Sequence, residues 1–246
     1  MKNLIQTLVE SVNAKAEVTD FFIRDDDVGW AGDLLYKLTN RVFDLGVPID
    51  FAIIPMALDS KSEKQLLDLK LQAPQLIGFH QHGYAHTNHQ PQGRKCEFGE
   101  HRIKDQQRTD IMKGVNRLYA AFGDLPDSVF TPPWNRCNQN TVDVLLECGF
   151  EILSRDNTAQ SLDTGSLQEL PISIDWLKKR KGTRLSVPAF LEDSNSHIVQ
   201  NQRIGIMLHH EMMDEADIDL FSAFVSALSA CPKARFQSMT QLGGLA

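Results

Sequence analysis

Three consecutive carboxylates follow an apolar run near the start of the chain. The run Phe-Phe-Ile-Arg at 21–24 leads directly into Asp25, Asp26 and Asp27. Adjacent carboxylates repel one another, and burying them beside a strand costs free energy unless a cation is near. A metal ion or an arginine would relieve this repulsion, whereas an acidic turn or a helix cap is the plainer alternative. The triplet therefore predicts a cation site at the end of this run.

A dense group of histidines follows a second apolar run. Four of the eight histidines lie between His80 and His89. His82 and His86 are four residues apart, so both imidazoles can lie on one face of a helical turn. Two neutral histidines and one carboxylate leave open positions on zinc or a similar divalent ion. This density favours a metal site over a polar surface loop.

Two more polar clusters follow apolar runs later in the chain. The segment 131–136 reads Thr-Pro-Pro-Trp-Asn-Arg, and its proline pair either holds Trp134 against a substrate or forms a plain turn. The apolar run 203–208 leads into His209 and His210. A histidine at the end of a strand can exchange protons near neutral pH, or it can be a core or capping residue.

The elements that must position these clusters alternate between strands and helices. Short apolar runs predict strands at 21–24, 48–55, 76–81, 128–132, 150–154 and 203–208. Helical periodicity predicts helices at 2–14, 32–44, 61–72, 104–122, 138–148 and 216–230. This alternation is typical of parallel βα units, either in an open sheet or in a barrel. All four polar clusters follow predicted strands, and the carboxyl ends of parallel strands in a barrel meet on the face that holds active sites.

Composition narrows the class of protein. A chain of 246 residues suits one α/β domain, so we expect a single domain over 1–246. A net charge of −7 argues against a nucleic-acid partner. The amino terminus lacks the unbroken apolar stretch of a signal peptide, and no run is long enough to span a membrane, so we expect a cytoplasmic protein. The cysteines form no Cys-x-x-Cys pair and are expected to be free thiols.

In order and spacing, these clusters resemble the motifs of the NodB-type polysaccharide deacetylases, carbohydrate esterase family 4. The first motif of that family, a strand ending in Thr-Phe-Asp-Asp-Gly, aligns with 24–28. The resemblance implies that Asp26 is the general base and Asp27 a metal ligand, with Asp25 and Asp26 as the alternative pair. The second motif, His-x-x-x-His, aligns with His82 and His86 as the other two ligands.

The resemblance extends over residues 21–210. The fourth motif of the family carries an Asp-Trp pair, which is similar to Asp175-Trp176. The fifth motif ends a strand with Leu-x-His, which implies that His209, or alternatively His210, is the general acid. The implied fold is a distorted (β/α)-barrel of about seven parallel strands.

One family residue is missing from the third motif. The arginine that steadies the base in the family is replaced by Thr131, so the resemblance implies that Arg24 or Arg136 substitutes for it. Trp134, Trp176 and Arg136 are expected to contact the substrate, with core packing as the alternative for the two tryptophans.

The resemblance implies a metal-dependent hydrolase, with zinc as the expected ion, that removes an acetyl group from the amide nitrogen of an N-acetylated sugar or a related cytoplasmic compound. The ion would polarise the acyl carbonyl and lower the pKa of water, and the two proton-transfer residues would each contribute about 10²–10⁴-fold. Two alternatives remain open: a non-catalytic, carbohydrate-binding relative and another metal-dependent amidohydrolase.

Overall fold

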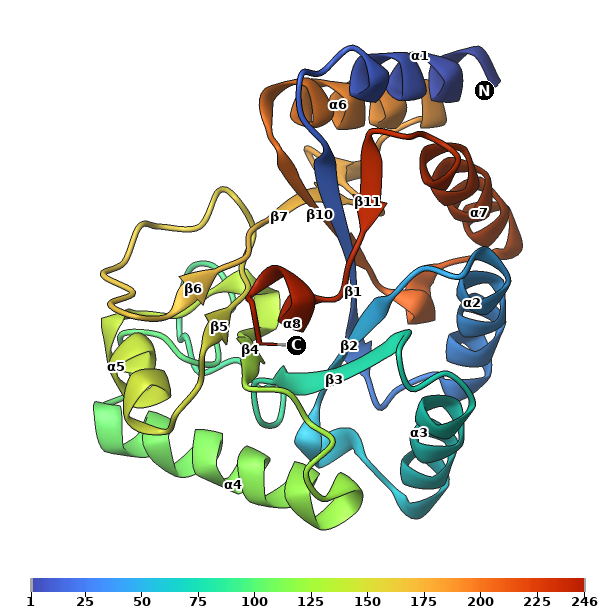
Figure 1. The fold of residues 1–246 in the computed structure, drawn as a ribbon. Helices are drawn as coiled ribbons and strands as arrows, with labels where there is room; N and C mark the ends of the chain where they lie inside the picture. Colours follow the sequence, from blue (N-terminus) through green and yellow to red (C-terminus); the bar gives the residue numbers. More distant parts are fainter. Residues whose placement is uncertain (1, 246) are drawn as a thin grey trace.

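The computed structural model describes residues 2–245 as a curled sheet of parallel strands with helices outside it (Figure 1). The strands of the sheet are β1 (Thr19–Val28), β2 (Ile49–Ile53), β3 (Ile77–His82), β4 (Val129–Thr131), β5 (Ile152–Leu153), β6 (Gln168–Glu169), β7 (Ile172–Asp175), β10 (Arg203–Leu208) and β11 (Ala234–Phe236). The helices are α1 (Lys2–Asn13), α2 (Gly32–Leu45), α3 (Ser60–Gln72), α4 (Lys104–Phe122), α5 (Gln139–Glu147), α6 (Val187–Gln200), α7 (Glu215–Ser229) and α8 (Met239–Leu242). A small antiparallel hairpin joins β8 (Lys179–Arg180) to β9 (Thr183–Arg184).

The sheet has the order β6-β5-β4-β3-β2-β1-β10-β7, and β11 pairs with the first residues of β1. Every strand pair in it is parallel. A single bridge between Asp156 and Ile172 brings the chain after β5 against β7, so the sheet curls toward closure. The predicted distorted barrel of parallel strands is confirmed. The sheet has nine strands rather than about seven, because the short β6 and β11 join its edge and its amino-terminal end.

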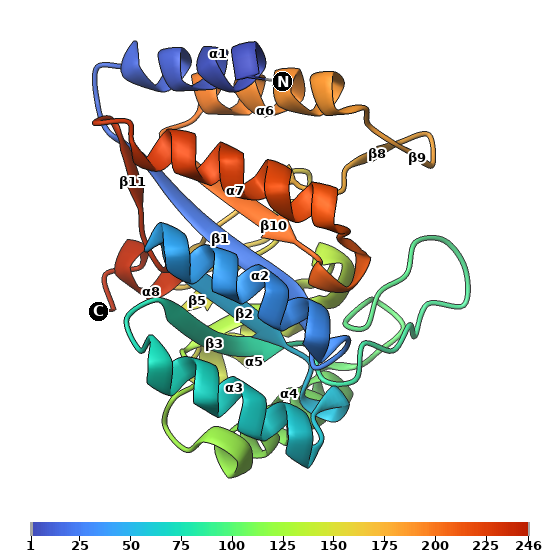
Figure 2. The same cartoon turned by 90° about the vertical axis from the view of Figure 1, so that its right-hand side faces the viewer.

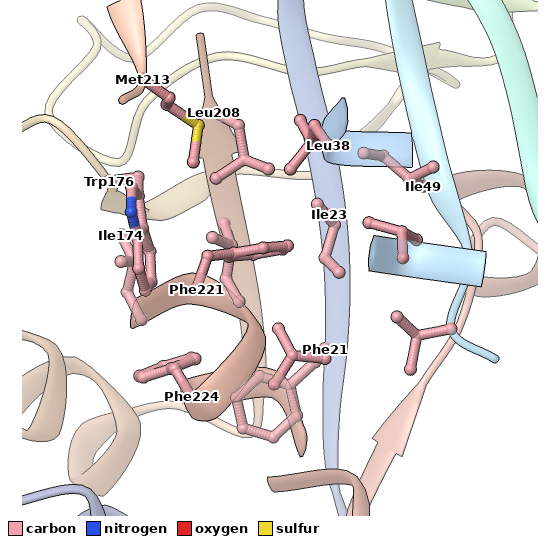
Figure 3. Close-up of a cluster of buried hydrophobic side chains, with 14 of the residues drawn as sticks. Phe21, Ile23, Leu38, Ile49, Ile174, Trp176, Leu208, Met213, Phe221 and Phe224 are labelled. Atoms are coloured by element: carbon pink, nitrogen blue, oxygen red, sulfur yellow. The ribbon is translucent and has the colours of Figure 1, made fainter. Parts of the chain in front are cut away.

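Alternation along β1 separates two apolar layers. Phe21 and Ile23 point outward and pack under the helices, in the cluster that Figure 3 shows. Phe22 points inward and packs with residues from four other strands of the barrel and with Met239 and Leu242 of α8. Helix α8 therefore closes the amino-terminal end of the barrel, and it lies inside the ring of strands in Figure 1.

The outer core also contains Trp176, which follows β7. Its ring packs edge-on against Phe190, Phe221 and Phe224, and only 2% of the residue is exposed. The expectation that Trp176 contacts a substrate is therefore wrong, and the alternative of core packing is correct. The reason is that α6 and α7 cover this side of β7 with apolar side chains (Figure 3).

Among residues 2–245, no helix combines the length and the apolar character that a membrane crossing requires. All four cysteines are free, as the sequence predicted.

A buried carboxyl group lies beside α8 at the amino-terminal end of the barrel. Asp50 of β2 is 1% exposed, and its Oδ2 accepts a hydrogen bond of 3.0 Å from the backbone N–H of Met239. Burial and the nearby charge of Asp127 raise the pKa of Asp50 to about 8. Burial likewise raises the pKa of Asp127 to about 6. The folded protein therefore holds a proton on Asp50 at pH values where an unfolded chain has lost it.

We expect Asp50→Asn to flatten the pH dependence of stability. Because folding raises the pKa of Asp50, protonated Asp50 stabilises the folded state at low pH. This contribution to the free energy of unfolding is lost as pH rises from about 4 to about 8, by at most about 1.4 kcal/mol per pH unit. Urea denaturation at pH 5.5 and 8.5 measures how much the free energy of unfolding falls between these two pH values. This fall should be smaller in Asp50→Asn than in the unchanged protein. Asp124→Asn, at an exposed carboxylate, is the control. If the free energy of unfolding of Asp50→Asn falls between pH 5.5 and 8.5 as much as that of the unchanged protein, this account is contradicted.

Candidate active site

The carboxyl ends of β1, β3 and β10 meet at a cavity of about 490 Å³. Figure 2 shows this end of the barrel on its right, where the loop 83–103 projects beyond the strands. The residues that line the cavity are Asp26, Asp27, Trp30, His82, His86, Lys95, Trp134, Asn135, His209, Glu211 and Met212. Three of the four polar clusters of the sequence contribute a titratable side chain to this list, and the Thr-Pro-Pro-Trp-Asn-Arg cluster contributes Trp134 and Asn135.

A break in β1 decides which of the three aspartates enter the cavity. Successive side chains of a regular strand point to opposite faces, so Asp26 and Asp27 could not both face inward. The register between β1 and β2 shifts between Asp25 and Val28, and Asp27 has a left-handed φ of 61°. This β-bulge turns Asp27 toward the same cavity as Asp26, whereas Asp25 remains on the other face.

Asp27, His82 and His86 form a cluster in which one potential ligand atom from each residue lies within 4.8 Å of the others. His82 Nε2 lies 3.2 Å and His86 Nε2 lies 3.1 Å from Asp27 Oδ1. The side chain of Asp27 is 9% exposed. Burial tends to raise the pKa of Asp27, but the hydrogen bonds and charges of the two histidines outweigh it and hold that pKa far below its usual range.

The second nitrogen of His82 shows which tautomer this site favours. Nδ1 lies 3.1 Å from the carbonyl oxygen of Thr131, which can only accept, so Nδ1 carries a proton. In the neutral ring, Nε2 then presents a lone pair to the carboxylate of Asp27. Two electron-rich atoms 3.2 Å apart need a cation or a proton between them. A histidine held by a backbone carbonyl in this way is the usual arrangement around a metal ion, and the donor set of two imidazoles and one carboxylate fits zinc.

His82 and His86 do not lie on a helical turn, contrary to the sequence prediction. His82 is the last residue of β3, and His86 lies in the loop that follows it with a left-handed φ of 53°. The fully buried Glu97, which sequence reasoning missed, holds this loop: its carboxylate accepts hydrogen bonds from the backbone N–H groups of Ala85 (2.8 Å) and Tyr84 (3.3 Å). A glutamate in a polar loop carries no sequence signal for such a contact.

Of the two arginines expected to take the place of the missing third-motif arginine, Arg24 is the one that contacts Asp26. It is fully buried in the barrel, and its Nε and Nη2 donate to the two oxygens of Asp26 at 2.7 and 2.9 Å. It also donates to Ser154 Oγ and Asn135 Oδ1, both at 2.7 Å, and to Met207 Sδ at 3.2 Å. Burial tends to raise the pKa of Asp26, but Arg24 and two histidines outweigh it and lower that pKa below its usual value. The carboxylate is therefore held ionised at the cavity floor.

Thr131, at the position of the family arginine, contacts a third histidine. Its Oγ1 lies 2.9 Å from His80 Nε2. Burial and the charge of Arg24 lower the pKa of His80 to about 3, so the ring is neutral. His80 is absent from the cavity lining, and His89 at the far end of the histidine group is exposed.

The two histidines after β10 have separate environments. His209 lines the cavity, and its Nε2 lies 3.9 Å from Asp27 Oδ2. His210 is buried, with its Nδ1 2.8 Å from Asp25 Oδ2 and its Nε2 2.9 Å from the carbonyl oxygen of Trp30. Burial tends to lower the pKa of His210, but the Asp25 carboxylate outweighs it and raises that pKa to about 9. Asp25 and His210 thus form an internal ion pair outside the cavity.

Asp175 ends β7, beside Met207 of β10. One of its oxygens accepts a hydrogen bond of 3.0 Å from the backbone N–H of Leu177. Burial raises the pKa of Asp175, and the charge of His209 partly offsets this rise. Asp175 is therefore close enough to His209 to act on its charge, although it does not line the cavity.

Two tryptophans flank His86 at the cavity wall. The Trp134 ring lies 4.4 Å from the His86 ring, and the Trp30 ring, which sequence reasoning did not single out, lies 5.3 Å from it on an edge-on contact. Trp134 and Asn135 both have left-handed backbone angles, with φ of 55° and 58°, which turn the chain after the proline pair. Arg136 follows them but lines a neighbouring cavity instead.

No protein-family model matches the chain, and no curated protein matches its sequence. Several solved structures share its fold. A candidate polysaccharide deacetylase from Mycobacterium smegmatis superposes with a TM-score of 0.70 at 17% identity, over 92% of this chain and 90% of that one. A family 4 acetyl xylan esterase from Clostridium thermocellum, solved with a cobalt ion, gives 0.60 at 13% identity, over 92% and 91%.

A family 4 pseudoenzyme from Bacillus anthracis gives a TM-score of 0.62 at 12% identity, over 94% of this chain and 66% of that one. At these identities the likeness establishes the fold, and active and inactive proteins both share it. The chain has the fold of the NodB-type deacetylases of carbohydrate esterase family 4, as its motifs predicted.

Proposed function

We propose that the protein is a metal-dependent deacetylase that hydrolyses the amide of an N-acetylated sugar or a related compound. The observation that carries this proposal is the convergence, in one cavity, of the cluster Asp27-His82-His86, an ionised Asp26 and His209. A pair of proton-transfer groups beside a cation site is the arrangement that hydrolysis of an unactivated amide needs.

Asp27, His82 and His86 would hold the ion, for which we propose zinc. A bound divalent ion supplies polarisation of the acyl carbonyl and a lower pKa for water. The 3.1 Å hydrogen bond from His82 Nδ1 to the Thr131 carbonyl orients this ring toward Asp27. Glu97 and the bulge at Asp27 position the other two ligands through the backbone.

The proton transfers fall to Asp26 and His209. Asp26 accepts the proton of the attacking water, and its two hydrogen bonds from Arg24 keep the carboxylate turned toward the cavity and ionised. His209, whose Nε2 lies 3.9 Å from Asp27 Oδ2, donates a proton to the nitrogen that leaves, because an amine cannot depart as an anion. Trp134 provides an aromatic wall for a sugar ring.

The alternative is a non-catalytic function, because one structural neighbour is a pseudoenzyme. Thr131 in place of the family arginine is the feature that would favour this alternative. The bidentate contact of Arg24 with Asp26 weighs against that alternative, because the proposed base keeps a guanidinium partner, here from its own strand β1. Acetate release from N-acetylglucosamine oligomers, N-acetylated sugar monomers and acetylated xylan by the zinc-loaded protein tests the proposal directly. Absence of release from every substrate would favour the non-catalytic function.

We expect Asp26→Asn to separate the base from the metal ligands. The variant should bind about one zinc ion per chain, as the unchanged protein does, yet lose about 10²–10⁴-fold in kcat, because it retains all three ligands but cannot accept a proton. Elemental analysis after dialysis and an acetate-release assay measure the two quantities. Asp27→Asn should instead lower zinc content.

Asp25→Asn is the matched control for this pair, because Asp25 lies on the other face of β1 and pairs with His210. It should lower the melting temperature and leave the zinc content unchanged. Loss of zinc in Asp26→Asn, with zinc retained in Asp27→Asn, would transfer the ligand role to Asp26.

We expect Arg24→Lys to shift the acid limb of the pH–rate profile upward. Lysine keeps a positive charge but loses the guanidinium fork that donates to both oxygens of Asp26, so the pKa of Asp26 should rise and kcat should fall by about 10–100-fold. Profiles of kcat against pH at constant zinc measure both effects. Asn135→Ala, which removes a partner of Arg24 but leaves the fork on Asp26, should give a smaller shift. An acid limb that stays in place in Arg24→Lys would refute this role of Arg24.

A further inference from the structure

A second cavity, of about 220 Å³, adjoins the active-site cavity, and Asn135 lines both. Its walls carry the side chains of Arg94, Arg136 and Arg155 together with Asp156. We call it the arginine pocket. The pocket thus gathers three positive charges, although the net charge of the chain is −7. Which of these guanidinium groups already pair with a carboxylate decides whether the pocket can bind an anion.

Two of the three arginines form no ion pair with any acidic group of residues 2–245. Arg155 is committed to Glu169, at 2.8 Å, and to the carbonyl oxygen of Gln160, at 2.9 Å. Within residues 2–245, no carboxylate lies within 4.0 Å of a nitrogen of Arg94 or Arg136, since neither belongs to an ion pair.

The arrangement around Arg136 is electrostatically unfavourable without an added anion. Burial and the positive charge of Arg94 lower the pKa of Arg136, and the carboxylate of Asp156 offsets this only in part. Asp156 is itself engaged, because its Oδ1 accepts a hydrogen bond of 2.8 Å from the backbone N–H of Thr158.

Arg136 is also held in place. Its Nη1 donates a hydrogen bond of 2.8 Å to the carbonyl oxygen of Lys95, on the loop that carries His86. The ammonium group of Lys95 lies 5.7 Å from the centre of the Trp134 ring, at the edge of the active-site cavity. Positive charge therefore continues from the arginine pocket to the aromatic wall.

We propose that the arginine pocket binds an anionic substituent, a carboxylate or a phosphate ester, of the same substrate whose acyl group lies at Asp27, His82 and His86. This inference rests on the proposed deacetylase function and narrows its substrate to acidic or phosphorylated sugars. A guanidinium group recognises both anions through two parallel hydrogen bonds, and Arg94 and Arg136 supply two such groups with no competing carboxylate in contact. Asn135 links the pocket to the catalytic groups, because its Oδ1 accepts from Arg24 at 2.7 Å.

Binding to the catalytically blocked Asp26→Asn protein tests this proposal without turnover. Calorimetric titration at low ionic strength would compare N-acetylglucosamine with N-acetylglucosamine 6-phosphate, N-acetylglucosamine 1-phosphate and N-acetylmuramic acid, which carries a carboxylate. At least one charged sugar should bind 10-fold or more tightly than the neutral one. Whether that sugar carries a phosphate or a carboxylate identifies the anion. The preference should persist in zinc-free protein, which excludes direct binding of the anion to the metal.

The double substitution Arg94→Gln and Arg136→Gln, in the same background, should abolish the preference and leave the affinity for N-acetylglucosamine unchanged. Lys179→Gln with Arg180→Gln is the matched control, because it removes the same charge from the exposed hairpin of β8 and β9. Equal binding of neutral and charged sugars, or an equal loss in the control, would overturn the proposal. If charged sugars bind more tightly but no substrate releases acetate, the anion site is supported and the deacetylase function is contradicted. If acetate is released but charged and neutral sugars bind equally, the deacetylase function is supported and the anion site is contradicted.

Discussion

The guanidinium group of Arg24 is completely buried inside the barrel, and the organisation of the active-site end depends on how it is compensated. An isolated buried charge costs several kcal/mol, and such a charge persists only with a counter-ion and satisfied hydrogen bonds. Arg24 has both: the two oxygens of Asp26, the hydroxyl of Ser154 and the amide oxygen of Asn135. These partners come from three separate segments of the chain, so one side chain links β1 to the chain after β5 and to the turn after β4.

This ion pair divides the barrel interior into two halves. Toward the amino ends of the strands the interior is mainly apolar, with Asp50 as a buried polar residue; it is filled by Phe22 and its neighbours and closed by Met239 and Leu242 of α8. Toward the carboxyl ends it is polar and opens into the cavity with Asp27 and the histidines. The ion pair with Asp26 compensates the buried charge of Arg24, and it also holds Asp26 ionised between the apolar and polar halves of the barrel. The stability of the barrel and the proposed chemistry therefore depend on the same ion pair.

Fold and function separate clearly among the structural neighbours. The barrel is shared by an acetyl xylan esterase solved with cobalt and by a pseudoenzyme, at similar TM-scores. What distinguishes an active site on such a barrel is a small set of side chains and the backbone that aims them. Here that backbone includes four left-handed residues that line the same cavity, Asp27, His86, Trp134 and Asn135. Left-handed angles at residues other than glycine carry a free-energy cost of about 1–3 kcal/mol, and they persist where the surrounding contacts over-determine them.

The class of fold, the helices α1–α5 and α7, the strands β1–β5 and β10, and the polar clusters that meet at the carboxyl ends of the strands could be predicted from the sequence, because apolar periodicity and the position of polar residues after each run are local properties. The sequence did not reveal α6 or β7, whose segments are short or rich in polar residues, and it misplaced Trp176, whose burial depends on helices distant in sequence. The tertiary structure was needed to show that a bulge in β1 places Asp26 and Asp27 in the same cavity. It was also needed to show that His210 pairs with Asp25, which leaves His209 as the histidine after β10 that lines the cavity. The structure also shows that Arg24 rather than Arg136 contacts Asp26. The bulge depends on a backbone angle at Asp27 that residue types do not specify. The other two choices depend on contacts distant in sequence: Asp25 and His210 are 185 residues apart, and Arg24 is held by Ser154 and Asn135, which are 130 and 111 residues away.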